Sequence, residues 1–283
     1  MKTKILLPTD FSKNAWNAIS YATDLFQDKE CEFYILNVYT VRGYALENMM
    51  VPEPGELEYE REKKKSGEGL EKVLDMLSFR DRNEKHSFYT ISQFNSLLAG
   101  LKDIVEKKDI DMVIMGTKGS TNAGGVVFGS NAITIMENLR NCPVIAVPEE
   151  ARFAILKEIV FPTSFKTHFK RRELQYLTDI AKLTKASICI VHVATDDTLS
   201  DIQENNKKLL EECFEEVNYT FHTLHGSSPS EAVRYFVESR DSDMIAFINK
   251  KHSFFGSLLS RPMVKEIGLY SKVPIMALHD FRN

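Results

Sequence analysis

The most constraining feature of this sequence is an internal repeat, because four apolar segments of the first half recur in the second half in the same order. The paired segments are 4–11 with 158–165, 34–38 with 188–193, 111–115 with 243–247, and 142–147 with 273–278. A repeat this long indicates duplication of a whole domain rather than a solenoid. The 283 residues are enough for two domains of about 140 residues, and we expect them at 1–148 and 155–283.

Within each half, short apolar runs of strand length alternate with patterns of helical period. In the first half, the predicted strands are 5–7, 32–38, 86–91, 112–115 and 143–147, and predicted helices include 15–26 and 96–107. Alternation of this kind predicts an α/β fold, in which each half is an open five-stranded parallel sheet with helices on both faces. Ligands of such sheets bind beyond the carboxyl ends of the strands, where the strand order reverses.

Two segments follow predicted strands at that edge. Pro8-Thr9-Asp10 follows the first strand, and a glycine-rich loop begins at Gly116 after the fourth. If these two strands are neighbours, the two segments face each other across one crevice. An aspartate before a helix is also an ordinary cap, so either Asp10 or Ser12 would cap the helix that follows.

The loop itself has the order strand, glycine-rich loop and helix, which is a phosphate-binding geometry because backbone N–H groups and the helix dipole converge on an anion. We expect Ser130 or Asn131 to cap that helix. Neither G-x-x-x-x-G-K-[ST] nor G-x-G-x-x-G occurs in the chain, which excludes a P-loop and a Rossmann dinucleotide fingerprint.

The spacing Gly116-x2-Gly119-x9-Gly129-Ser130 resembles the nucleotide signature of the ATP-binding branch of the universal stress protein family. The resemblance implies two tandem Rossmann-like domains of the adenine nucleotide alpha hydrolase type, with ATP bound in the first, accompanied by magnesium or manganese. The nucleotide-binding residues that it implies are Thr9, Asp10, Val38, Met115, Gly116, Lys118, Gly119, Gly129, Ser130 and Asn131. Of these, the acidic residue and Val38 would contact the adenosine, and the glycine loop would hold the phosphates.

The second half lacks this signature. By the repeat, Ser164 stands at the position of Asp10 and Ile248 at that of Gly116, while Gly119 falls on about Lys251 and Gly129-Ser130 on Ser260-Arg261. An apolar cluster at 254–263 would fill the vacated pocket, contact the first half or bind an apolar ligand. We therefore expect one nucleotide site per chain.

The resemblance also implies an intramolecular pseudo-dimer, with 143–147 paired against 274–278, and leaves a dimer of chains open. It favours a nucleotide-responsive binding module for stress or signalling. A slow ATP hydrolase and a scaffold that binds no nucleotide remain alternatives. No catalytic residue is predicted, because none of the seven histidines stands in a recognisable triad.

Composition limits the partners. A net charge of −4 and a pI near 6.0 give no overall attraction to nucleic acid or an anionic membrane. The four cysteines have no metal-site spacing, and no run approaches 18 apolar residues. We expect a cytoplasmic protein without a signal peptide or membrane span.

Overall fold

The structure is a computed structural model that describes residues 2–41, 56–80, 82–118, 128–194, 198–225, 228–249 and 271–279. The first half contains β1 (Thr3–Pro8), α1 (Lys13–Leu25), β2 (Cys31–Tyr39), α2 (Leu57–Ser78), β3 (His86–Phe94), α3 (Leu97–Lys108), β4 (Met112–Gly116), α4 (Ser130–Asn138) and β5 (Val144–Val147). The second contains β6 (Glu158–Pro162), α5 (Arg171–Thr184), β7 (Ser187–Val193), α6 (Asp201–Phe214), β8 (Tyr219–Leu224), α7 (Pro229–Arg240), β9 (Met244–Asn249) and β10 (Ile275–His279).

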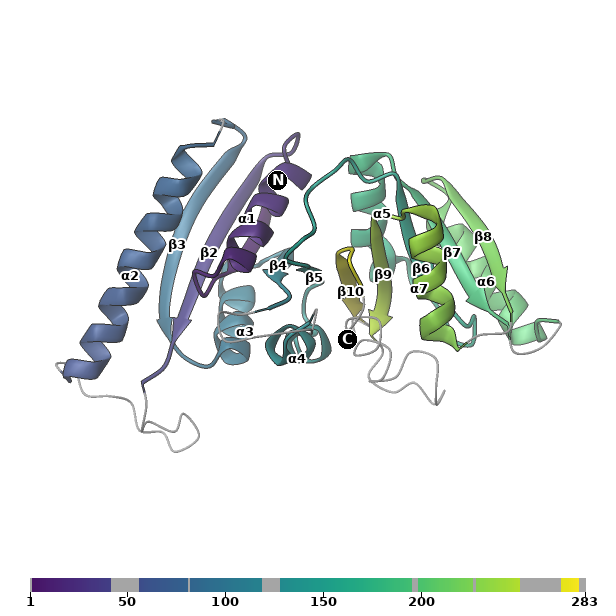
Figure 1. Ribbon diagram of the computed structural model, residues 1–283. Coiled ribbons are helices and arrows are strands. Elements are labelled where there is room, and N and C mark those ends of the chain that lie inside the picture. The colour runs from purple at the N-terminus through teal and green to yellow at the C-terminus, as the bar shows by residue number, and fades with distance from the viewer. Residues whose placement is uncertain are drawn as a thin grey trace.

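The ten described strands form one continuous sheet in the order β3-β2-β1-β4-β5-β10-β9-β6-β7-β8 (Figure 1). All pairs within β1–β5 and within β6–β10 are parallel, so each half is a five-stranded parallel unit. The order of the second half repeats that of the first. The predicted α/β fold with two such units is therefore confirmed.

Helices cover both faces of the sheet because its strands are apolar on both sides. In β1, the side chains of Ile5 and Leu7 pack with Ile19 of α1 in one buried cluster. Leu6, which points to the other face, packs with Leu101 of α3 in a second cluster. Parallel strands buried on both faces read as continuous apolar runs, which explains the sequence pattern.

The two halves meet at an antiparallel pair, with Met276 of β10 opposite Ile145 of β5. This is the strand pairing that the resemblance implied. Side-chain hydrogen bonds reinforce the junction: Asn249 Nδ2 donates to the carbonyl oxygen of Met136 at 3.0 Å, and Arg140 donates to the carbonyl oxygen of Asn249 at 2.6 Å. The far end of α4 is thus fixed to the second half.

The connection from β5 to β6 is also bonded to the first half. Asn17 of α1 donates to the carbonyl oxygens of Pro148, at 3.0 Å, and Ala151, at 2.7 Å. Arg152 in turn donates to Asn17 Oδ1 at 2.8 Å. This connector therefore lies against α1 rather than standing free in solvent.

Candidate nucleotide-binding site

The site lies where the sheet order reverses, because β1 pairs with both β2 and β4. Beyond β1 the chain makes a tight turn that is anchored to β2. The N–H of Thr9 donates to the carbonyl oxygen of Leu36 at 2.8 Å, and Asn37 Nδ2 donates to the carbonyl oxygen of Thr9 at 2.7 Å. Inside the turn, the N–H of Phe11 donates to Thr9 Oγ1 at 3.0 Å. These bonds hold the loop after β1 at the carboxyl edge.

Of the two candidate caps for α1, the structure selects Ser12. Its hydroxyl accepts a hydrogen bond from the N–H of Ala15 at 3.2 Å, whereas the exposed carboxylate of Asp10 accepts one from the N–H of Ser12 at 3.1 Å. The Asp10 carboxylate is therefore positioned by the turn and does not cap the helix.

Gly116, at the end of β4, lies against α1. A Cβ at this position would stand 3.0 Å from the backbone oxygen and 3.0 Å from the Cγ of Asn14. A glycine here thus lets the helix approach the strand, which is a packing reason for this residue that does not depend on any ligand.

Asn14 and Thr117 are functional candidates that the sequence reasoning missed. Asn14 is 3% exposed, and its Nδ2 donates to Thr117 Oγ1 at 3.4 Å and to the carbonyl oxygen of Lys118 at 3.2 Å. The carbonyl oxygen of Thr117 accepts a hydrogen bond from the N–H of Gly129 at 2.6 Å. The two ends of the glycine loop are therefore bonded to each other and to α1. An amide among the apolar residues of a buried helix face was the available signal.

Helix α4 begins one or two residues earlier than predicted. Gly129 is its N-cap, with φ −74° and ψ 161°, and Ser130 is the first helical residue. The expectation that Ser130 or Asn131 caps the helix is wrong, because the extended backbone conformation falls on the glycine. As a result, the hydroxyl of Ser130 is not used for capping, and the first N–H groups of the helix lie at the carboxyl edge.

A cavity of about 200 Å³ brings the predicted residues together. It is lined by nine of them: Thr9, Asp10, Val38, Met115, Gly116, Lys118, Gly129, Ser130 and Asn131. The tenth, Gly119, lies outside the described residues. Pro8, Ala15, Leu97, Thr117 and Ala132 complete the lining.

The charges at this cavity suit a phosphorylated ligand. Among the described residues that line it, Lys118 is the only one with a cationic side chain, and the amino end of α4 contributes a positive dipole worth about 0.3–1 kcal/mol to a nearby anion. Asp10 is the only carboxylate in the part of the lining that the structure describes. Any metal would therefore draw most of its oxygen ligands from phosphate and water, and the described residues contain no group of three metal-ligating side chains.

The second half has the same turn after its first strand but lacks the carboxylate. The N–H of Phe165 donates to Thr163 Oγ1 at 3.0 Å, as Phe11 does to Thr9, and Ser164 occupies the place of Asp10. Ile248, in the place of Gly116, is 3% exposed. The other two positions compared, Lys251 and Ser260-Arg261, and the apolar cluster at 254–263 lie outside the described residues.

None of the four cysteines is poised for nucleophilic chemistry. All four are buried free thiols, and burial raises the pKa of Cys31 and Cys142 to about 12. These groups are therefore neutral at physiological pH, and a neutral thiol is a poor nucleophile.

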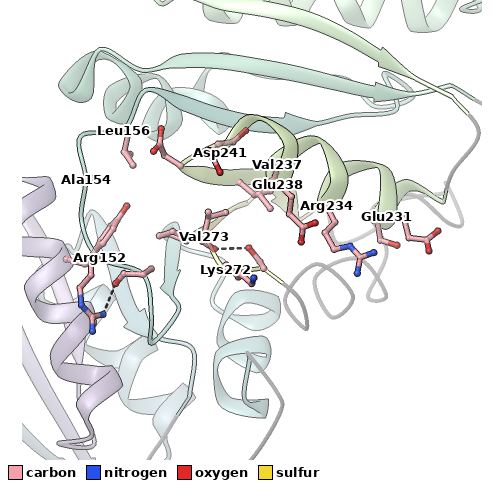
Figure 2. A pocket seen from close by; sticks show the side chains of 18 of the residues that line it. Arg152, Ala154, Leu156, Glu231, Arg234, Val237, Glu238, Asp241, Lys272 and Val273 are labelled. Atoms are coloured by element: carbon pink, nitrogen blue, oxygen red, sulfur yellow. Dashed lines mark hydrogen bonds between the residues drawn. The ribbon is translucent and has the colours of Figure 1, made fainter.

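A larger cavity, of about 1060 Å³, opens near the amino ends of β9 and β10 (Figure 2). None of the predicted site residues lines it. Glu231, Arg234 and Glu238 lie along α7 at its wall, with Lys272 nearby (Figure 2). Charges of both signs alternate there, so this cavity favours no particular ligand charge.

In the part of the chain that the structure describes, no helix is long and apolar enough to span a bilayer.

Comparison with known proteins places the fold. Residues 1–148 match the sequence profile of the universal stress protein family. Universal stress protein MJ0531 of Methanocaldococcus jannaschii is 28% identical over 151 residues, which cover 51% of this chain and 81% of that protein. A solved universal stress protein from Archaeoglobus fulgidus aligns with a TM-score of 0.71 at 17% identity and covers 97% of both chains. A functionally unknown protein from Pseudomonas aeruginosa, PA1789, aligns with a TM-score of 0.63 at 11% identity, covering 98% of this chain and 92% of that one.

The two structural alignments cover both halves of the chain, and the sequence match covers the half with the glycine loop. The chain therefore belongs to the universal stress protein family, as a member with two tandem domains.

Proposed function

We propose that the first half binds an adenine nucleotide, ATP in the first instance, and that the protein acts as a nucleotide-responsive binding module. The observation that carries the proposal is the cavity at the sheet reversal, because predicted residues from three distant segments of the sequence line it together. The segments are the turn after β1, the end of β2, and the glycine loop with the start of α4.

Each segment has a chemical role in this proposal. The exposed Asp10 carboxylate accepts hydrogen bonds from ribose hydroxyls, and the backbone of Val38 at the end of β2 meets the adenine edge. Gly116 and Gly129 leave the backbone open to phosphate oxygens, while the Ser130 hydroxyl and the first N–H groups of α4 donate to them. Magnesium or manganese would accompany the nucleotide and neutralise phosphate charge.

The proposal includes domain boundaries at 1–148 and 155–283 and assigns nucleotide binding to the first domain alone. In the second, Ser164 replaces the carboxylate, and the buried Ile248 side chain occupies the position where the first half has a glycine. A reducing compartment such as the cytoplasm suits the protein, because its cysteines are all unpaired thiols.

The test is a calorimetric titration of the purified chain with ATP, ADP, AMP and cAMP, preceded by mass analysis of any ligand released on denaturation. The cyclic nucleotide is included because a universal stress protein has been solved in complex with cAMP. We expect one ATP per chain and a gain of about 2.7 kcal/mol in unfolding free energy at a hundredfold excess over Kd.

Two variants and one control separate the site from general effects of added charge. Gly129→Arg and Asp10→Ala should abolish or weaken ATP binding, whereas Asn138→Arg adds the same cation at the opposite end of α4 and should leave it unchanged. Melting temperatures without ligand show whether Gly129→Arg folds. Absence of any titratable nucleotide, or equal binding by all three variants, would contradict the proposal.

A further inference from the structure

A second cavity, of about 510 Å³, lies between α1 and α2 on the other side of the turn that follows β1. It shares Thr9 with the nucleotide cavity. Its apolar lining comes from Phe11, Trp16, Val73 and Met76. Phe11 is 40% exposed and Met76 42%, so this crevice presents apolar surface to solvent. Sites of this volume with apolar walls are typical of small-molecule binding.

The ring of Phe11 is directed toward the crevice by a constrained backbone. Its φ of 64° is in the left-handed region, which is unusual for an aromatic residue, and the bond from its N–H to Thr9 Oγ1 holds the turn. Gly69 of α2 makes room for the ring, because a Cβ there would stand 2.4 Å from two of its atoms. A strained turn and a glycine within a helix thus combine to place one half-exposed ring.

The second half provides an internal comparison, because the same turn occurs there with the crevice closed. Phe165 also has a left-handed φ, of 55°, but is 2% exposed, and Phe169, in the same buried cluster, is 5% exposed. Helix α6 is bonded directly to this turn, because Asn206 Nδ2 donates to the carbonyl oxygen of Phe165 at 2.7 Å and Gln203 Nε2 donates to that of Ser164 at 2.9 Å. The turn and the domain fold therefore do not require an open crevice, and the open crevice is a feature of the first half.

The rim of the crevice is positive. Lys13, Lys65 and Lys72 line it together with one carboxylate, Glu68, in a chain whose net charge is −4. Lys65 pairs with Glu62 and Glu68 with Lys64, but Lys13 and Lys72 form no ion pair with the part of the chain described here. An apolar floor below two such ammonium groups is complementary to an amphiphilic anion.

We propose that this crevice is a second ligand site, which binds a small organic anion with an apolar body, such as a medium-chain carboxylate. The apolar chain lies against Phe11, Trp16 and Met76, and the carboxylate accepts hydrogen bonds from Lys13 and Lys72. The site is distinct from the nucleotide cavity and needs no nucleotide to form.

The experiment uses the full chain without nucleotide and decanoate as the probe, with decanol as the matched uncharged control. Trp16 is the only tryptophan of the chain, so its fluorescence reports on this crevice directly. We expect a saturable change at one decanoate per chain, confirmed by calorimetry. Decanol should bind more weakly, and decanoate affinity should fall with added salt.

Lys13→Gln and Lys72→Gln should each weaken decanoate binding by about two- to fivefold, as expected for exposed charge pairs. Lys102→Gln, an exposed lysine on α3 away from the crevice, should leave binding unchanged. Saturation with ATP should leave decanoate bound. The proposal is overturned by equal affinity for decanol, by identical behaviour of the three lysine variants, by displacement of decanoate by ATP, or by the absence of saturable binding.

Discussion

Two glycines of α2 allow a matched test of how the ring of Phe11 is seated. Gly67 and Gly69 both lie inside the helix, but a Cβ at Gly67 meets nothing within 4 Å, whereas one at Gly69 stands 2.4 Å from the Phe11 ring. Replacing each by alanine therefore makes the same change in helix propensity and differs only in this contact.

The magnitudes follow from the structure. Alanine is favoured over glycine inside a helix by about 0.8–1.0 kcal/mol, so Gly67→Ala should stabilise the protein by about that amount. Gly69→Ala must also displace a ring that is 40% exposed. Full burial of a phenylalanine contributes about 1.5–3 kcal/mol, so losing the buried part costs about 1–2 kcal/mol. Gly69→Ala should therefore be neutral to about 1 kcal/mol destabilising.

Urea unfolding followed by Trp16 fluorescence measures both variants, and Trp16 reports on the first half because it lies in α1. In a Phe11→Ala background the two glycine substitutions should become equally stabilising, since the ring that separates them is gone. Equal stabilisation in the wild-type background would refute the reasoning, because it would mean that the ring moves away from Gly69 without cost.

Three further predictions concern other contacts. A hydrogen bond from Arg240 is the main cause that lowers the pKa of Glu158 to about 2. The ionised carboxylate therefore stabilises the fold fully above about pH 4.5, and this stabilisation is lost as the pH falls through about 2. In chemical unfolding, Glu158→Gln should cost about 1–2 kcal/mol at pH 7, and the cost should shrink steadily toward pH 2. Gly116→Ala should cost about 1–3 kcal/mol of unfolding free energy, because the new Cβ crowds the Asn14 backbone. The melting temperature should fall accordingly, and an unchanged melting temperature would contradict that packing. Asn249→Ala removes donors to two α4 carbonyls and should cost about 1–2 kcal/mol by calorimetry; no loss would mean that water replaces them.

The strands followed from the sequence because parallel strands buried on both faces leave continuous apolar runs, whereas their order in the sheet came from the structure. The repeat then supplied the second half. The cap of α4 was expected at Ser130 or Asn131 and lies at Gly129, since all three are good capping residues and only the backbone angles distinguish them.

Contacts between distant segments could not be read from the sequence. The role of Asn14 depends on how closely α1 approaches β4, and that distance is set by packing in three dimensions. The left-handed φ of Phe11 was likewise unpredictable, because an aromatic residue rarely adopts it. Both features lie beside the cavity at the ends of β1 and β4, so the sequence did not predict the contacts that hold its walls in place.

The antiparallel pair of β5 and β10 has a consequence for which five-stranded units pair with each other. If the two five-stranded units were separate chains that paired through these edges, they would form three kinds of pair, two symmetric and one mixed. The connector from Val147 to Glu158 raises the local concentration of the unlike partner, so each chain forms only the mixed pair. Covalent linkage thereby makes the asymmetric assembly independent of the abundance of either unit.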